Sequence, residues 1–304
     1  MKWKHLPIVA FDTETTGLEP FNGDRIIEVA AVVFHLDSDG AIAREEPHSW
    51  LLNPRIPIPK KVTRITGITD ADVANQPEFL AIATQVRDLL AGAVTIAHNY
   101  PFDLAFLTQE LLKVDLTWPE PLAEIDTVDL SLKHFHNERG HKLEDLCRRL
   151  DVRLDGAHRA TNDAAACGRC FIELARRNQV EDDLQAMLDW SNAIGRPPER
   201  GPLTTDASGR VIFREGAHRG QPVADHPIHL AWMEKARERA EDGWRWRFPE
   251  SSRRWIRRWL DVRGSGRARQ SPKSFRPEDW VIDSCITDRP SAGGVNLADA
   301  RTVT

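Results

Sequence analysis

The chain has 304 residues, of which 41% are hydrophobic and 29% are charged, and this composition fits a soluble globular protein of roughly two domains. No apolar run approaches the ~20 residues that a membrane-spanning helix needs, and the apolar run near the N-terminus is too short for a signal sequence. Four cysteines in a chain of this length do not indicate a disulfide framework. We therefore expect a cytoplasmic protein that does not associate with a membrane.

The net charge of −5 conceals two halves of opposite sign. Residues 1–184 carry 20 Lys+Arg and 30 Asp+Glu, a net charge of −10, whereas residues 185–304 carry 21 Lys+Arg and 16 Asp+Glu, a net charge of +5. An acidic half joined to an arginine-rich half is typical of a catalytic body with a part that handles polyanions. Scattered, solvated charge is the alternative.

The predicted elements start with three strands, at residues 8–11, 25–34 and 49–52, which short connections join into an antiparallel meander. Apolar spacing predicts helices at 60–66 and 77–90, a buried strand at 93–97, and a helix at 104–112. One more strand at 123–128 and helices at 143–150 and 161–177 follow. The order of elements indicates an α/β fold, with a mixed sheet flanked by helices, that ends near residue 180.

Two carboxylates follow the first predicted strand directly. The side chains of Asp12 and Glu14 alternate with Thr13, so both point to one face at the end of the strand. Two carboxylates that close repel each other unless a cation lies between them, and Mg2+ and Mn2+ prefer such oxygen ligands. Because Asp-x-Glu is a common tripeptide, this pair alone leaves both a metal site and a solvated strand end open.

Three residues further along the chain extend this pair. Asp103 closes a strand-to-helix segment, Asp163 begins a helix, and His158 precedes it by five residues in a glycine-containing loop. Singly, these residues fit a helix cap, a first-turn acid and a surface histidine. Together, the four carboxylates can hold two divalent ions about 3.5–4 Å apart that clamp a phosphodiester. A loop histidine suits a general base that deprotonates the attacking water.

The segments FDTETTG, HNYPFD and HRATND, in this order and spacing, resemble the three motifs of the DEDDh 3′–5′ exonucleases, a family that includes the proofreading epsilon subunit of bacterial DNA polymerase III. The resemblance covers about residues 6–180. It implies a ribonuclease-H-like fold with a mixed five-stranded sheet and two divalent metal ions, Mg2+ or Mn2+. The catalytic residues it implies are His158 as the general base and, as metal ligands, Asp12 (bridging both ions), Glu14, Asp103 and Asp163.

The same resemblance implies positions that hold the 3′-terminal nucleotide or orient the second motif. Thr66 stands where many members have histidine, which leaves one contact to the terminal base open. Arg159 stands where the tyrosine subclass needs a tyrosine, so the resemblance is to the histidine subclass. The expected substrate-binding residues are Thr13, Thr15, Leu18, Thr66, Asn99 and Phe102.

The C-terminal half is expected to form a smaller unit. Residues 181–200 are polar and end in Gly-Arg-Pro-Pro, which indicates a linker. Residues 210–223 are predicted to form a hairpin and residues 228–233 to begin a helix, and this stretch resembles a small module of some bacterial exonuclease-X-like proteins. The expected organisation is an exonuclease domain at 1–184, a linker at 185–204, a small basic, Trp-rich α+β module at 205–262, and a disordered tail at 263–304.

Arginine and tryptophan alternate in the last third of the chain. Residues 245–276 contain eleven Lys+Arg and two acidic residues, and tryptophans are interleaved with them. Basic side chains follow a phosphate backbone and aromatic faces stack on bases, so the segment is either an accessory DNA grip or an amphipathic helix. We expect at least half of its tryptophans to pack in the core of the module and its arginines to contact DNA. Residues 185–190 loosely resemble a sliding-clamp-binding peptide.

The sequence thus predicts a metal-dependent 3′–5′ exonuclease that releases 5′-mononucleotides from DNA 3′ ends, in repair or in proofreading-like trimming. An RNA-trimming exonuclease stays open, because sugar choice depends on the pocket around the 2′ position. A non-catalytic polymerase-accessory subunit is the third alternative, and the intact set of catalytic residue types argues against it. DNA is the expected partner, with a polymerase or a sliding clamp left open.

Overall fold

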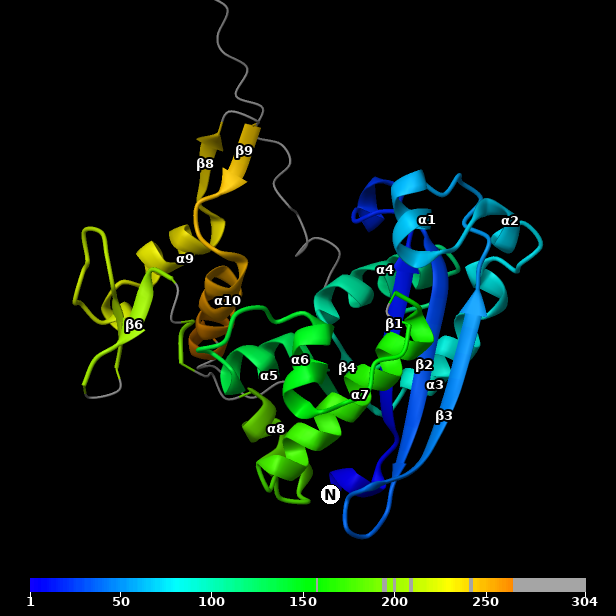
Figure 1. Cartoon of the computed structure of the whole chain (residues 1–304), viewed down its shortest axis with the longest axis horizontal. Coiled ribbons are helices and arrows are strands. Elements are labelled where there is room, and N and C mark those ends of the chain that lie inside the picture. The colour runs from blue at the N-terminus through cyan, green and yellow to red at the C-terminus, as the bar shows by residue number, and fades with distance from the viewer. Residues whose placement is uncertain (157, 193–195, 199–200, 208–209, 241–242, 265–304) are drawn as a thin grey trace, which may run out of the picture. The chain divides into compact units, whose positions relative to one another are not determined.

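The computed structural model describes residues 1–156, 158–192, 196–198, 201–207, 210–240 and 243–264 (Figure 1). The tail predicted at 263–304 lies almost wholly outside these residues. All described residues belong to one compact unit, residues 1–266. Among them, no helix is both long enough and apolar enough to cross a membrane.

A mixed five-stranded sheet carries the N-terminal part, as the sequence predicts. Its central strand β1 pairs antiparallel with β2 and parallel with β4, while β3 and β5 form the edges in the order β3-β2-β1-β4-β5. Because β1, β4 and β5 are parallel, their carboxyl ends meet at one edge of the sheet. The strands are β1 Ile8–Thr15, β2 Ile26–Leu36, β3 Ile42–Leu51, β4 Val94–Ala97 and β5 Ala123–Asp126.

Helices cover both faces of this sheet. The α-helices of the described residues are α1 Lys60–Thr66, α2 Asp70–Val73, α3 Ala83–Leu90, α4 Tyr100–Leu112, α5 Thr127–His134, α6 Leu143–Leu150, α7 Ala160–Arg177, α8 Leu184–Asn192, α9 Pro227–Lys235 and α10 Glu250–Gly264. Short 3-10 helices are η1 Trp3–His5, η2 Pro20–Asn22, η3 Phe79–Ala81 and η4 Val223–Asp225.

Alternate residues of β1 face two separate hydrophobic cores. Ile8 and Ala10 pack in a core with residues of α5, α6 and α7, whereas Val9 and Phe11 pack in a second core with residues of α3 and α4. Figure 1 shows α7 across one face of the sheet and α3 on the other. The period-2 geometry of a strand therefore assigns the even-numbered residues of β1 to the face that α7 covers.

The C-terminal residues build a small hydrophobic core of their own. Two hairpin-like pairs, β6 Leu203–Thr205 with β7 Val211–Phe213 and β8 Arg237–Ala240 with β9 Gly243–Trp246, accompany α9 and α10. Trp255 and Trp259 are buried in this core beside Leu230 and Met233. These two tryptophans therefore pack in the core of the module, as expected for at least half of the tryptophans in this segment.

Several predicted elements differ from the structure. The helix expected at 77–90 is divided into η3 and α3, and α5 was not predicted. The linker expected at 185–204 contains most of α8 and the strand β6. In the hairpin expected at 210–223, the second segment makes only isolated bridges to β7, from Arg219 and Pro222, while β7 forms a regular antiparallel pair with the upstream β6.

The segment at 185–190 that resembles a clamp-binding peptide lies within α8. Met187 is fully buried there, and the ring of Trp190 lies 5.7 Å from that of His134 and 6.1 Å from that of Phe171. Side chains that pack in the protein's own core are not free to anchor a partner.

Candidate active site

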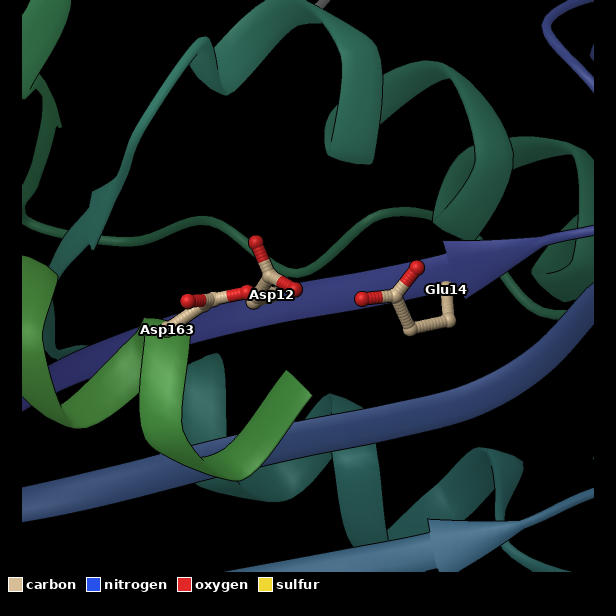
Figure 2. Close-up of side chains that lie close together, drawn as sticks. All are labelled: Asp12, Glu14 and Asp163. Atoms are coloured by element: carbon tan, nitrogen blue, oxygen red, sulfur yellow. The ribbon is translucent and has the colours of Figure 1, made fainter. Parts of the chain in front are cut away.

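Asp12 and Glu14 lie on the same side of β1, near the carboxyl edge of the sheet (Figure 2). They continue the face that Ile8 and Ala10 present to α7. Asp163, in the first turn of α7, points toward Asp12. One carboxylate oxygen from each of Asp12, Glu14 and Asp163 lies within 4.8 Å of the others, so strand alternation and helix packing together produce a three-carboxylate cluster.

A glycine lets α7 come close enough to the sheet to complete this cluster. A Cβ atom added to Gly168 would lie 2.2 Å from the ring of Phe34 and 3.0 Å from the Cβ of Ala10. Any side chain here would push the helix away from β1 and β2. Since Asp163 lies about one turn and a half before Gly168 on the same helix, the close approach also places its carboxylate beside Asp12.

Asp103 approaches the same strand from the other core. It is buried in the first turn of α4, and its Oδ1 accepts hydrogen bonds from the backbone N–H of Thr13 (2.9 Å) and from Thr13 Oγ1 (2.7 Å). Asp103 is not one of the three residues whose carboxylate oxygens lie within 4.8 Å of one another. Its charge nevertheless raises the pKa of Asp12. The structure thus brings all four predicted ligands to β1, three on one face and one through Thr13.

Burial raises the pKa values of all four carboxyl groups, and repulsion from nearby carboxylates adds to it for Asp12, Glu14 and Asp163. Burial is the largest cause in each case, and for Asp12 the charges of Asp103 and Asp163 add to it. The pKa rises to about 8 for Glu14, to about 7 for Asp103, to about 6 for Asp163, and well above the ordinary range for Asp12.

These four side chains fit hard divalent cations. They offer only carboxylate oxygens, the donors that Mg2+ and Mn2+ prefer. A positive charge placed among them would favour their ionised forms, which burial now disfavours. The donor set and the crowding therefore favour a divalent-metal site.

His158 lies on the exposed loop that leads into α7. Its backbone has a positive φ of 67°, and its backbone N–H donates to Asp163 Oδ2 at 2.9 Å. The main chain of the predicted base thereby holds a predicted metal ligand, while its imidazole ring is on an exposed residue. The hydrogen bond between His158 and Asp163 is seen only in the structure, because the sequence gives the spacing of the two residues but not their contact.

The expected substrate-binding residues fall into two groups. Thr13, Thr15 and Leu18 lie at and after the end of β1; Thr15 Oγ1 donates to the carbonyl of Gly17 at 2.6 Å, and Leu18 is 75% exposed. Leu18 thus presents an exposed apolar side chain in the turn that follows β1.

The remaining expected positions are held by the protein itself. Thr66 Oγ1 donates to the carbonyl of Val62 (3.2 Å) and accepts from the backbone N–H of Ile68 (3.1 Å). Asn99 has a left-handed backbone (φ 74°) just before α4, and the ring of Phe102 lies 5.0 Å from that of Phe106. Both of these residues shape the start of α4.

Glu28, a buried acid on β2, was not among the residues predicted from the sequence. Its carboxylate accepts two hydrogen bonds from Arg159 (2.9 and 3.2 Å) and one from the backbone N–H of Ala160 (3.1 Å). It thus fixes the residue that follows His158 and satisfies an unpaired donor at the start of α7. The signal in the sequence was a single acid inside the apolar run at 26–34.

Replacing Glu28 with glutamine is expected to lower the free energy of unfolding by about 1–3 kcal/mol, because a buried charge-assisted pair is broken. Urea denaturation measures the loss. Glu45→Gln is the matched control, since Glu45 also joins a strand to α7, through Arg169, but is 25% exposed against 1% for Glu28. An equal loss in both variants would show that burial of Glu28 has no special effect.

The sequence profile of the RNase_T exonuclease family matches residues 9–171, more than half of the chain. The chain belongs to the exonuclease family. The matched segment contains all five predicted catalytic residues, and the resemblance read from the three motifs is confirmed.

Among its relatives, this chain is 40% identical over 169 residues to the 3′-5′ exonuclease DinG of Bacillus subtilis (strain 168); the alignment covers 56% of the chain and 18% of DinG. It is 38% identical over 175 residues to the DNA polymerase III subunit epsilon of Treponema pallidum (strain Nichols), covering 56% of the chain and 77% of that protein. The chain therefore spans less than a fifth of DinG and most of the epsilon subunit.

A solved structure of exonuclease I shares the fold. The two superpose with a TM-score of 0.51 at 19% identity, covering 61% of this chain and 43% of that one. At this identity the likeness extends to the fold alone, and it confirms the predicted ribonuclease-H-like sheet flanked by helices.

Proposed function

We propose that this member of the family is a metal-dependent 3′–5′ exonuclease that hydrolyses phosphodiester bonds at DNA 3′ ends and releases 5′-mononucleotides. The observation that carries the proposal is the convergence of Asp12, Glu14 and Asp163 within 4.8 Å, with Asp103 joined to the same strand through Thr13. Buried or half-buried carboxylates this close together are unfavourable without a cation between them, which favours a metal site.

In the proposed mechanism the protein binds, orients and moves a proton. Asp12, Glu14, Asp103 and Asp163 would hold two divalent ions, which supply an activated water and stabilise the leaving oxygen. The exposed turn around Leu18 would support the terminal nucleotide. The imidazole of His158 would take the proton of the attacking water as it forms a bond to phosphorus.

DNA is the proposed substrate. Two relatives have names that refer to DNA polymerase III or to a 3′-5′ exonuclease. An RNA-trimming activity is the second candidate. A polymerase acting in trans remains a proposed partner, since a relative is named as a polymerase subunit.

The assay that tests this proposal compares 3′-labelled DNA and RNA oligonucleotides of one sequence with Mg2+ or Mn2+. We expect labelled mononucleotide from the DNA, none after chelation of the metal, and slower release from the RNA. Faster release from the RNA would make the chain an exoribonuclease. No release from either, with Asp12→Ala identical to the wild type, would leave a non-catalytic binding subunit.

An exposed patch of arginine and tryptophan on the C-terminal module is the proposed accessory contact to DNA. Trp246 is 42% exposed, and the guanidinium of the exposed Arg237 lies 4.3 Å from its ring centroid, while the buried Arg253 packs 3.8 Å from the same centroid. Trp232 is 47% exposed, with the guanidinium of Arg247 5.6 Å from its ring. Cations stacked on exposed aromatic rings offer both phosphate and base contacts to single-stranded DNA.

Replacing Arg237 with alanine is expected to reduce the slope of log affinity against log salt by about one, because one phosphate contact is lost. Binding of a short single-stranded oligonucleotide to the inactive Asp12→Asn protein measures this without degrading the DNA. Arg176→Ala is the control, since Arg176 is paired with Glu173 on α7. The same salt slope in both variants and the wild type would place the patch outside the DNA path.

A further inference from the structure

Arg254 of α10 reaches from the C-terminal module to the second catalytic motif. Its Nη1 donates to Asn99 Oδ1 at 2.8 Å, its Nε donates to Asp129 Oδ1 at 2.7 Å, and its Nη2 pairs with Asp126. The side chain is only 14% exposed. One guanidinium thus uses three of its nitrogens on residues more than a hundred positions earlier in the chain.

The Asp126 carboxylate passes this contact on to the start of α4. Asp126 ends β5, and its two oxygens accept the backbone N–H groups of Asn99 and Tyr100, each at 3.1 Å. No side chain from the capping position of α4 itself satisfies these first donors. The carboxyl ends of β4 and β5 lie side by side, which is why Asp126 can reach them.

Asn99 needs this support because its backbone is left-handed, with φ 74° and ψ 50°. An L-residue other than glycine holds this conformation at a cost, and surrounding contacts must fix it. Its backbone N–H is held by Asp126 and its side-chain amide oxygen by Arg254. Both contacts depend on the guanidinium, directly or through its ion pair.

The first turn of α4 carries Asp103, whose Oδ1 is bound by the N–H and the hydroxyl of Thr13. A continuous chain of contacts therefore runs from Arg254 through Asp126 and the start of α4 to a proposed metal ligand. We propose that Arg254 is a positioning residue that fixes the start of α4 and thereby the carboxylate of Asp103. This inference rests on the proposed exonuclease function.

The C-terminal module is then part of the support of the active site, in addition to any contact with DNA. Arg258 reinforces the same junction, since its Nη1 donates to Asp129 Oδ2 at 3.0 Å. Deleting the module to test its DNA contacts would also remove Arg254, so point variants are needed to separate the two effects.

The test compares Arg254→Ala with Arg254→Lys and with Arg257→Ala in the full chain. Arg257 is the matched control: it lies on the same helix but is 54% exposed and pairs with Glu234 inside the module. We expect kcat of Arg254→Ala to fall about 10- to 100-fold with KM unchanged, because a catalytic group displaced by about 1 Å loses up to that much rate. A higher Mn2+ concentration should be needed for half-maximal rate.

A readout independent of turnover is amide hydrogen exchange at Asn99 and Tyr100 in the metal-free protein. Arg254→Ala should accelerate exchange at these two amides, whereas Arg257→Ala should leave it unchanged. Arg254→Lys keeps the charge but not the fork of donors, so we expect it to restore the fold fully and kcat only in part. If Arg254→Ala does not fold, Arg254→Lys carries the test alone through the same exchange and kcat measurements.

The two proposals fail in distinguishable ways. A wild-type protein without nuclease activity overturns the proposed function, while faster exchange at the start of α4 in the Arg254 variant would still establish the positioning. Normal kcat, normal Mn2+ dependence and unchanged exchange in an active Arg254→Ala protein overturn the positioning role. In the Asn99→Gly background, which removes the amide but tolerates positive φ, the effect of Arg254→Ala on kcat should shrink; full additivity would also contradict it.

Discussion

Asp12→Asn is expected to lower the rate of nucleotide release by about 10³-fold or more, the loss seen when a central charge-stabilising group is removed from an active site. Asp12 lies in the middle of the cluster, within reach of both Glu14 and Asp163, and the amide cannot bridge two cations. Release of mononucleotide from a 3′-labelled oligonucleotide measures the rate at saturating Mg2+ and Mn2+.

The same variant has a second expected property. Because burial and like charges disfavour the ionised Asp12 carboxyl group in the folded protein, a neutral amide should raise the free energy of unfolding of the metal-free protein by about 0.5–2 kcal/mol. Mn2+ should raise the melting temperature of the wild type and not that of the variant. Asp39→Asn, in an exposed turn, should match the wild type throughout; a metal-induced shift retained in Asp12→Asn would contradict the assignment.

His158→Asn is expected to lower kcat by about 10²–10⁴-fold, the usual contribution of a general base, while KM and metal affinity stay near those of the wild type. Asparagine is the informative substitution, because the φ of 67° at this position suits asparagine better than alanine. The backbone N–H that donates to Asp163 is kept in this variant. The loss should therefore report on the imidazole ring.

A matched control separates the loss of the imidazole ring from a general effect of changing this loop. Arg153→Asn is a control, since Arg153 lies on the same connection between α6 and α7 and pairs with Asp155 at the surface. A His158→Asn protein with normal kcat would exclude the histidine as the base and leave the water to another group.

Much of the site could be predicted because its parts are local in the sequence. The alternation at Asp12 and Glu14 follows from strand geometry, and the apolar run before them identifies the strand. The spacing of the three motifs then indicated the family, and with it the fold. The burial of Trp255 and Trp259 also followed from their separation by one helical turn.

The contacts that the sequence did not predict join residues that are far apart in the chain. Glu28 and Arg159 are 131 positions apart, and Arg254 and Asp126 are 128 apart. No pattern of neighbouring residues predicts either ion pair. A lone arginine or glutamate in a charged chain usually lies in solvent, so its burial cannot be inferred from the sequence. The missed pairing of β6 with β7 has the same origin, because propensity predicts a strand but not its partner.

By itself, the sequence determined the residue types of the site, their order and the strand that carries the first two, because periodicity and motif spacing are properties of the chain alone. Only the tertiary structure decided that Asp163 meets Asp12, since the glycine contact at Gly168 sets the distance between α7 and the sheet. It also decided that Asp103 comes from the opposite core through Thr13 and that Arg254 supports it. Burial removes water from these groups, so each must find its partner within the fold, wherever in the chain that partner lies.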